Sequence, residues 1–247
     1  MRNDSAETVK NIVWGKEHYL EIAGKKGNIM KKRILCYGDS NAWGYMPGTG
    51  MRYAENQRWP GIVSKLLADS CLVIEDNISG RTTVFDDPYL DYRNGKTGLG
   101  YALAAHAPLD LVILSLGTND LKYTDAVGSW KGIDELLHLL DHTDACFPLP
   151  GGVSNCPDGL KVLVISPILI HSRIASLRPE SSFRNQYGES LKFAGYYEKA
   201  ADAHHAYFMN AADYASPSLT DCVHMDPESH LTLGRAVTEK IREIFLL

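Results

Sequence analysis

Short apolar runs that alternate with helix-like segments are the feature of this sequence that most constrains its fold. The run at residues 109–116 is the longest of them, and it is typical of a central parallel strand that is covered on both faces. Strands that alternate with helices are joined by right-handed crossovers into a parallel sheet with helices on both sides. The pattern therefore predicts an α/β fold, a three-layer α/β/α sandwich around a flavodoxin-like parallel sheet of about five strands. The predicted strands span residues 33–37, 71–75, 109–116, 161–166 and 206–209.

The apolar spacing between these strands predicts several helices. One opens near Pro60, because the first helical turn accepts proline, and residues 59–67 place their apolar side chains on one face. The last helix starts after Pro227, with Asp226 as its N-cap. The other predicted helices cover about 98–107, 130–142 and 187–205.

Length and composition fit one folded domain. The chain has 247 residues, of which 45% are hydrophobic, enough for one sizeable core. We expect residues 30–247 to form a single domain, preceded by an N-terminal extension, residues 1–29, with no catalytic role. The extension carries only a weak helical pattern, and it lacks the continuous apolar run of a signal peptide. The expected location is therefore cytoplasmic.

The charge of the chain excludes two classes of partner. The formal net charge is -5 at pH 7 and the pI is about 6.0. There is accordingly no basic stripe for nucleic acid and no polybasic segment for an anionic membrane surface. Nor does any stretch of about 20 apolar residues predict a membrane span. A small neutral or ester-like substrate is not excluded by this charge.

Neither the cysteines nor the histidines predict a metal or a cofactor. The five cysteines are scattered and form none of the close pairs of a zinc ribbon or a redox motif, which fits a reducing compartment. A Cys146–Cys156 bridge is the less favoured alternative. His138 and His142 lie one helical turn apart, but the glutamate of a metalloprotease helix is missing from the pattern. His230 is expected at the surface or at a helix cap.

Polar residues follow three of the predicted strands. Ser40 comes after the first strand, Gly80 after the second and Asn119 after the third. The carboxyl ends of parallel strands meet at one edge of a sheet, where ligands bind. A serine nucleophile needs a base and a carboxylate that orients the base. Asp221 and His224, three positions apart before the last helix, supply both, so the sequence predicts a Ser-His-Asp catalytic set.

Acyl transfer by a serine also needs hydrogen-bond donors for the developing oxyanion. The candidates are the backbone N–H groups of Ser40 and Gly80 and the side-chain amide of Asn119. Glycine at position 80 lets the backbone approach a substrate closely. Without these partners, Gly38-Asp39-Ser40 would be an ordinary turn signal.

The four blocks around these residues resemble those of the SGNH (GDSL-type) hydrolases, named for their Ser, Gly, Asn and His. Ser40, Gly80 and Asn119 match the first three blocks, and Asp221 with His224 matches the final Asp-x-x-His block. Each block alone is a weak signal, but all four occur in order, each at an expected strand end. The resemblance covers most of the chain after the N-terminal extension and implies the SGNH hydrolase fold.

Four further stretches resemble the bacterial arylesterase and acyltransferase branch of that superfamily. The resemblance implies a serine esterase that cleaves short-chain, often acetyl, esters of aryl or alkyl alcohols through an acyl-enzyme. It also implies acyl transfer to alcohols and a homo-oligomer. The stretches are residues 38–44, 58–61, 80–83 and 106–110.

The chain departs from the usual pattern of this branch at two positions. Ala42 stands where threonine is frequent, and Cys222 stands where glycine is frequent in the Asp-Gly-x-His block. The second departure puts in doubt the turn that holds Asp221 and His224, although both functional groups are present.

Each of several other residues near the four blocks is compatible with two roles. Trp43 and Tyr45 are candidates for substrate binding, with an oligomer contact as the alternative. Asp39 is a further candidate for substrate binding, and a carboxylate that bonds the turn backbone is the alternative. Asp120 is more often a loop brace than a base in such a position.

Two other functions stay open at this point. A carbohydrate O-acetylesterase or a thioesterase would use the same catalytic residues. A catalytically silent α/β module would bind a ligand at the same edge, since fold does not fix function. The complete catalytic set argues against the silent module, which has no chemical need for it.

Overall fold

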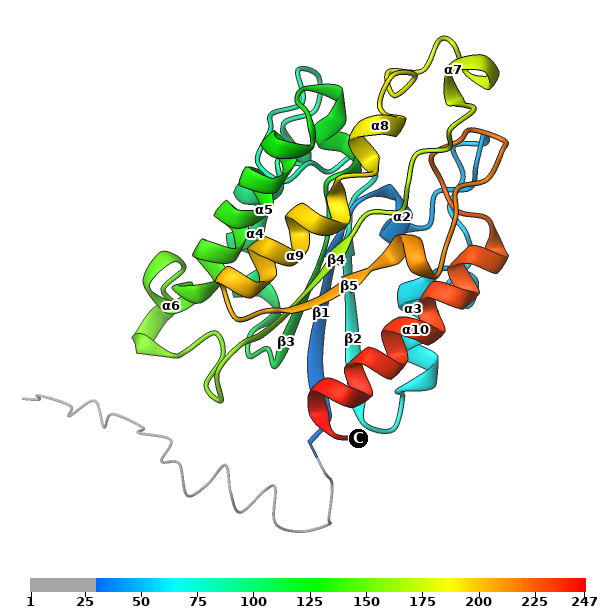
Figure 1. Ribbon diagram of the computed structural model, residues 1–247. Coiled ribbons are helices and arrows are strands. Elements are labelled where there is room, and N and C mark those ends of the chain that lie inside the picture. Colours follow the sequence, from blue (N-terminus) through cyan, green and yellow to red (C-terminus); the bar gives the residue numbers. More distant parts are fainter. Residues whose placement is uncertain (1–29) are drawn as a thin grey trace, which may run out of the picture. The chain divides into compact units, whose positions relative to one another are not determined.

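Five parallel strands form the centre of the computed structural model, which describes residues 30–247 (Figure 1). Their order across the sheet is β2-β1-β3-β4-β5. This confirms the predicted α/β fold, whereas the expected extension at residues 1–29 lies outside the described residues. The strands are β1 (Lys32–Gly38), β2 (Cys71–Asn77), β3 (Leu111–Ser115), β4 (Lys161–Ser166) and β5 (Tyr207–Asn210).

Helices cover both faces of the sheet, so that the molecule has three layers (Figure 1). On one face lie α3 (Trp59–Leu66) and α10 (Pro227–Phe245), and on the other α4 (Gly95–His106), α5 (Ala126–Asp141) and α9 (Phe193–Ala203). Short helices complete the loops: α2 (Ser40–Trp43), α6 (Thr143–Cys146), α7 (Ile174–Leu177) and α8 (Tyr187–Ser190), with the 3-10 helices η1 (Asp91–Arg93), η2 (Thr118–Lys122), η3 (Pro150–Gly152) and η4 (Ala211–Asp213).

Each face of the sheet has its own apolar core. Ile34 and Cys36 of β1 belong to the core under α3 and α10, whereas Leu35 and Tyr37 belong to the core under α4, α5 and α9. All four side chains have no exposed surface. Burial on both faces explains why this strand is a continuous apolar run rather than an alternating one.

The helix ends follow from local hydrogen bonds. Asp226 caps α10 by accepting from the Ser229 N–H at 2.8 Å, as predicted. The predicted helix over 187–205 is interrupted between α8 and α9. There, Ser190 Oγ donates to the Tyr187 carbonyl and accepts from the Ile170 N–H. A serine that bonds neighbouring backbone in this way competes with a continuing helix.

His230 is fully buried on the inner face of α10, so the expectation of a surface or capping position is wrong. Its Nδ1 accepts a hydrogen bond from the Trp59 N–H at 3.3 Å and so links α10 to α3. Burial lowers the pKa of His230 to about 4. A neutral imidazole is therefore part of the contact between these two helices.

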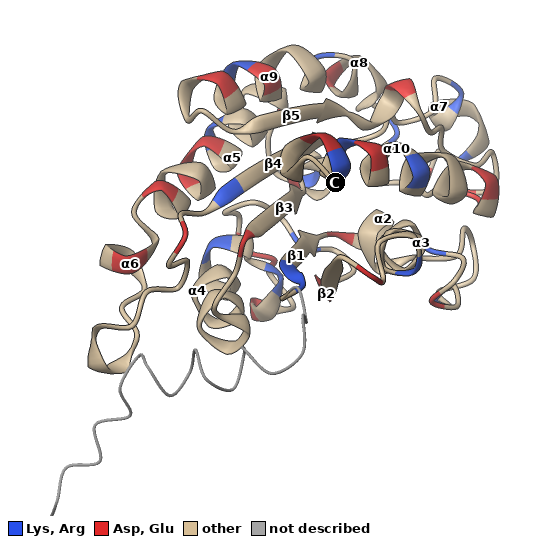
Figure 2. Cartoon of the chain, turned by 90° about the horizontal axis from the view of Figure 1, so that it is seen from below, with Lys and Arg blue, Asp and Glu red and all other residues tan. Residues whose placement is uncertain are grey.

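Charged residues of both signs are spread over the helices and the loops that join them (Figure 2). None of the described helices combines the length and the apolar composition that a membrane span requires. Cys146 and Cys156 are free thiols, as are the other three cysteines.

An imidazole joins the end of α9 to α5. His204 Nδ1 lies 2.5 Å from Asp141 Oδ2, and its Nε2 lies 3.1 Å from Asp134 Oδ1. Burial alone would lower the pKa of His204, but the two carboxylates outweigh it and raise the pKa above its ordinary value. The protonated ring is therefore the form that holds the two helices together.

We expect this contact to make stability depend on pH. Because the native pKa of His204 is raised, the stabilisation is complete below the unfolded pKa of about 6.5 and is lost as the pH rises through the native value. The carboxylates are partly exposed, so His204→Gln is expected to lower the free energy of unfolding at pH 6 by only about 0.5–1 kcal/mol, and by less at pH 9. Urea unfolding of the native protein, this variant and the control His138→Gln measures the difference. An equal loss at both pH values would contradict the assignment.

Candidate active site

A tight turn at the end of β1 presents Ser40. Asp39 Oδ1 accepts from the Asn41 N–H at 3.0 Å and caps α2, whose first residue is Ser40. A Cβ on Gly38 would lie 2.5 Å from the Ala42 Cβ, so only glycine lets the strand turn so sharply into the helix. Ser40 retains 5% of its surface exposed, at the carboxyl end of the sheet.

The structure brings Ser40, His224 and Asp221 together, as the sequence predicts. Ser40 Oγ lies 2.9 Å from His224 Nε2, and His224 Nδ1 lies 2.7 Å from Asp221 Oδ2. The other carboxylate oxygen of Asp221 accepts from the N–H groups of Val223 and His224, at 3.0 and 2.9 Å. Burial would raise the pKa of Asp221, but these hydrogen bonds and the imidazole hold it below its ordinary value. The carboxylate is thus ionised and fixed against the ring.

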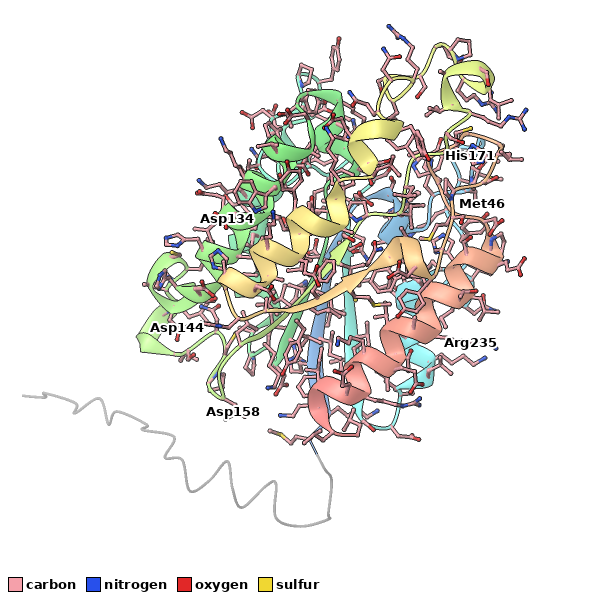
Figure 3. All side chains as sticks on the ribbon, in the orientation of Figure 1. Met46, Asp134, Asp144, Asp158, His171 and Arg235 are labelled. Atoms are coloured by element: carbon pink, nitrogen blue, oxygen red, sulfur yellow. The ribbon has the colours of Figure 1, made fainter. Side chains whose placement is uncertain are left out.

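Cys222 adopts a left-handed conformation, with φ at 67°, between the carboxylate and the imidazole. This conformation favours glycine, which explains why a glycine is frequent in this block. The thiol is fully buried, and the Cys222 carbonyl accepts from the His171 N–H at 2.9 Å. The turn therefore keeps Asp221 and His224 in contact despite the cysteine. Figure 3 shows His171 at the same end of the molecule as Met46, which follows α2.

Asn41 is a positioning residue that the sequence did not reveal. Its Oδ1 accepts from the Met225 N–H at 3.1 Å, and its Nδ2 donates to the Val223 carbonyl at 3.3 Å. These bonds fix the backbone on both sides of His224 to the residue next to Ser40. No local pattern signals this role, because the contact joins residues more than 180 positions apart.

The predicted oxyanion residues lie at the ends of the neighbouring strands. Gly80 follows β2 with φ at 86°, and the loop is tied to β1 because the Ile78 N–H donates to the Gly38 carbonyl at 3.0 Å. Asn119 lies in η2 after β3, is 4% exposed, and donates its Nδ2 to the Arg81 carbonyl at 3.1 Å. A primary amide has two N–H groups. One therefore stays open for a substrate oxygen.

We expect Asn119→Ala to lower kcat by about a hundredfold to a thousandfold, the usual cost of one lost oxyanion donor. The effect is on kcat rather than KM if the amide acts mainly on the transition state. Steady-state kinetics on an aryl acetate measures both. Asn155→Ala is the matched control, since this buried amide lies at the opposite end of the sheet, where the Leu109 N–H donates to its carbonyl. A similar fall in both variants would contradict the role of Asn119.

Asp120 braces the loop, as expected, rather than reaching the nucleophile. It is fully buried and accepts hydrogen bonds from the Thr83 N–H, the Thr83 hydroxyl and the Ser129 hydroxyl, each at 2.8 Å. Burial raises its pKa to about 7. The carboxyl links the loop after β2 to η2 and so fixes the positions of Gly80 and Asn119 relative to each other.

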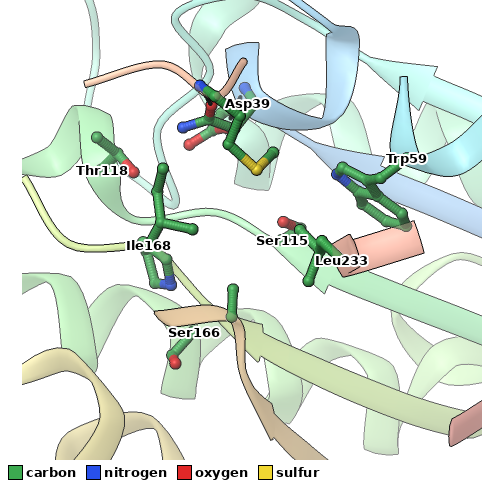
Figure 4. Close-up of a pocket in the computed structure, with 11 residues that line it drawn as sticks. Asp39, Trp59, Ser115, Thr118, Ser166, Ile168 and Leu233 are labelled. Atoms are coloured by element: carbon green, nitrogen blue, oxygen red, sulfur yellow. Dashed lines mark hydrogen bonds between the residues drawn. The ribbon is translucent and has the colours of Figure 1, made fainter. Parts of the chain in front are cut away.

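Asp39 has the turn-forming contact. It is 3% exposed, and burial raises its pKa to about 6. Its side chain lines a small cavity together with Trp59 and Ser166 (Figure 4). The cavity, about 10 Å³, has room for about one water molecule and not for an ester. Substrate binding by Asp39 stays a prediction.

Tyr45 stacks directly on the imidazole. The ring centroids of Tyr45 and His224 are 4.2 Å apart and the planes meet at 30°. Trp43 instead packs against the guanidinium of Arg52, 5.1 Å from the ring centroid. The structure therefore brings Tyr45 into the site, whereas Trp43 has its described contact outside the catalytic set.

Comparison with known proteins agrees with this geometry. The sequence profile of the GDSL-like Lipase/Acylhydrolase family matches residues 36–232. The chain belongs to this family. The match includes every residue of the catalytic set, and it identifies the protein as a GDSL-like hydrolase that acts on carboxylic esters.

Solved structures resemble this GDSL-like hydrolase over nearly their full length. A carbohydrate acetylesterase family member from Sinorhizobium meliloti is 32% identical, with a TM-score of 0.78 over 87% of this chain and 100% of that chain. The native aryl esterase of M. smegmatis is also 32% identical, with a TM-score of 0.77 over 86% and 99%. A lipase/acylhydrolase from Enterococcus faecalis, at 15% identity and a TM-score of 0.59 over 86% and 96%, shares the fold. No curated protein matched the sequence.

Proposed function

We propose that this GDSL-like hydrolase is a serine esterase that works through an acyl-enzyme. Ser40 Oγ bonds to the ester carbonyl carbon while its proton passes to His224 Nε2. The bond to the alcohol then breaks, and His224 returns the proton to the leaving oxygen. Water repeats the sequence with His224 as base, releasing the carboxylic acid and freeing Ser40. The observation that carries the proposal is the unbroken chain of hydrogen bonds from Ser40 through His224 to Asp221.

The oxyanion of each tetrahedral intermediate would be held by three donors. These are the backbone N–H groups of Ser40 and Gly80 and the free amide hydrogen of Asn119. What supports this assignment is their position at adjacent strand ends and the bond that joins Asn119 to the Gly80 loop through Arg81.

The substrates we propose are short-chain, acetyl-type esters of aryl or alkyl alcohols. The aryl esterase of M. smegmatis supports the aryl alcohol, and the S. meliloti carbohydrate acetylesterases support the acetyl group. Those acetylesterases also make a sugar acetate the second candidate. Tyr45, stacked on His224, supports an aromatic wall beside the reacting ester. Acyl transfer to alcohols, the homo-oligomer and the cytoplasmic location stay predictions.

Hydrolysis of 4-nitrophenyl esters from acetate to octanoate tests the proposal. We expect kcat/KM to be highest for acetate and to fall as the acyl chain lengthens. The same protein is assayed on acetylated sugars and on acetyl thioesters, with heat-denatured protein as the blank. A higher kcat/KM on a sugar acetate would favour the second candidate, and a maximum at octanoate would contradict a short-chain site. Adding ethanol and quantifying ethyl acetate by gas chromatography tests acyl transfer.

A further inference from the structure

The imidazole of His224 is held at its two nitrogens and across one ring face. Its Nδ1 lies 2.7 Å from Asp221 Oδ2, and its Nε2 lies 2.9 Å from Ser40 Oγ. The ring can still tilt about the line that joins these two contacts, because such a rotation lengthens neither of them. The Tyr45 ring lies flat over the imidazole, with the centroids 4.2 Å apart and the planes at 30°. It therefore limits the tilt that the two hydrogen bonds leave free.

The backbone of Tyr45 is tied to the residue that carries the nucleophile. The Ser40 carbonyl accepts from the Gly44 N–H at 2.9 Å and from the Tyr45 N–H at 3.0 Å. Gly44 has φ at 89°, and a Cβ there would lie 2.9 Å from the Arg58 Cβ, so glycine is required for this turn. The turn after α2 thus fixes Tyr45 directly to Ser40.

The loop after Tyr45 is also held from the side of the catalytic carboxylate. Tyr45 forms an antiparallel bridge with Arg52, which closes the loop. A Cβ on Gly48 would lie 2.9 Å from Thr220 Cγ2, so the loop packs against the residue next to Asp221. Contacts on both sides of the active site therefore determine where the Tyr45 ring lies.

The stacked ring faces a group that becomes charged in the proposed reaction. As Ser40 Oγ bonds to the acyl carbon, its proton passes to His224 Nε2 and the electron pair of the C=O bond moves onto the oxygen. The imidazole is then a cation, which the electron-rich face of a tyrosine attracts more strongly than a neutral ring. A contact that is stronger in the transition state than in the free enzyme lowers the barrier.

We propose that Tyr45 is a positioning residue for His224, which limits the tilt of the imidazole and stabilises its protonated form. The inference rests on the proposed function, in which His224 is the base. It goes beyond the predicted contact with substrate, because the ring acts through His224. Since His224 takes a proton from Ser40 and later from water, Tyr45 would assist both halves of the reaction.

Replacing Tyr45 by leucine and by phenylalanine tests this role, with 4-nitrophenyl acetate as substrate from pH 5 to 9. We expect Tyr45→Leu to lower kcat by about threefold to tenfold, with a smaller change in KM. The protonated ring is also less stable in the free variant, so the acid limb of kcat/KM should move to lower pH by about half a unit to one unit. Tyr45→Phe keeps the aromatic face and is expected to keep near-native kcat and an unmoved limb.

The titratable groups around His224 are the same in the native protein and in these variants, apart from Tyr45 itself. Besides Asp221, they are Asp39, which precedes Ser40, and His230 on α10. Burial raises the pKa of Asp39 to about 6, so this carboxyl titrates in the same range in every variant. Burial lowers the pKa of His230 to about 4, below the range measured. A limb that moves only in Tyr45→Leu therefore reports the loss of the stacked ring.

Tyr101→Leu is the matched control, since it removes a tyrosine that is 78% exposed on α4. It is expected to leave kcat, KM and the acid limb as in the native protein. Three results would overturn the proposal. One is a rise in KM with unchanged kcat, which places the ring against the substrate only. The others are an unmoved limb in Tyr45→Leu and equal losses in Tyr45→Leu and Tyr45→Phe.

A measurement that needs no turnover separates this inference from the proposed function. If the native protein cleaves no ester, the proposed function fails, and the stack is then tested by proton NMR. The Cε1–H signal of His224 is identified as the one missing from His224→Gln, and its shift is followed against pH. We expect the midpoint in Tyr45→Leu to lie about half a unit to one unit below that of the native protein. An unchanged midpoint would contradict stabilisation of the protonated ring by Tyr45.

Discussion

Replacing Ser40 with alanine is expected to lower kcat/KM for an aryl acetate by a factor of about 10⁵–10⁶, the scale seen when a catalytic serine is removed. The hydroxyl is the atom that would bond to the acyl carbon, and no other described side-chain oxygen is hydrogen-bonded to His224 Nε2. Residual turnover would come from the oxyanion donors and from binding alone. Initial rates with the native protein and Ser40→Ala, both purified in the same way, give the ratio.

Two measurements distinguish loss of the nucleophile in Ser40→Ala from misfolding of the variant. Thermal unfolding of Ser40→Ala is expected to resemble that of the native protein, because the Ser40 side chain makes one described hydrogen bond. Ser64→Ala, on α3 and away from the strand ends, is the matched serine control. A rate of more than about one hundredth of the native value in Ser40→Ala would contradict the acyl-enzyme mechanism.

The second large effect is expected from Asp221→Asn, at about 10⁴ in kcat. The native carboxylate accepts from Nδ1–H of His224, which leaves Nε2 without a hydrogen and able to take the proton of Ser40. An asparagine amide would instead donate to Nδ1 and drive the hydrogen onto Nε2, where it blocks that transfer. The asparagine oxygen can still accept from the N–H groups of Val223 and His224, so the turn persists.

The dependence of kcat on pH and a variant at a neighbouring carboxylate test whether the loss in Asp221→Asn comes from the orientation of His224. Asp226→Asn changes a carboxylate five positions further along, whose capping role an asparagine also fills, and it is expected to keep a near-native rate. If Asp221→Asn retained more than a tenth of the native kcat, orientation of His224 by Asp221 would be contradicted. If kcat of Asp221→Asn is low from pH 6 to 9 while the variant unfolds like the native protein, the role of Asp221 in orienting His224 is supported.

Strand positions were predictable because burial on both faces of the sheet leaves a continuous apolar run. β4 begins and ends where the sequence predicts, and the catalytic set was predictable because its residues lie in short blocks at strand ends. The break between α8 and α9 was not predictable, because the hydroxyl of Ser190 accepts a hydrogen bond from the Ile170 N–H, 20 residues away. Helical spacing does place His230 on the same face of α10 as Leu233 and Val237, but its hydrogen bond with the Trp59 N–H of α3 depends on the fold.

The role of Asn41 was equally hidden in the sequence. It depends on the backbone on both sides of His224, which the fold brings close to Asn41. Local spacing identifies which residue types can do chemistry, whereas the fold decides which polar groups are left with open donors.

The hydrogen bonds of Asn41 to the backbone on both sides of His224 also determine when the active site can form during synthesis of the chain. Ser40 is synthesised 184 residues before His224, so over that stretch of translation the nascent protein carries the serine without its base. The hydroxyl is then an ordinary alcohol and no more reactive than any other. The proposed esterase activity can begin only after the segment with Val223 and Met225 docks against Asn41, so a product truncated before this segment would lack it.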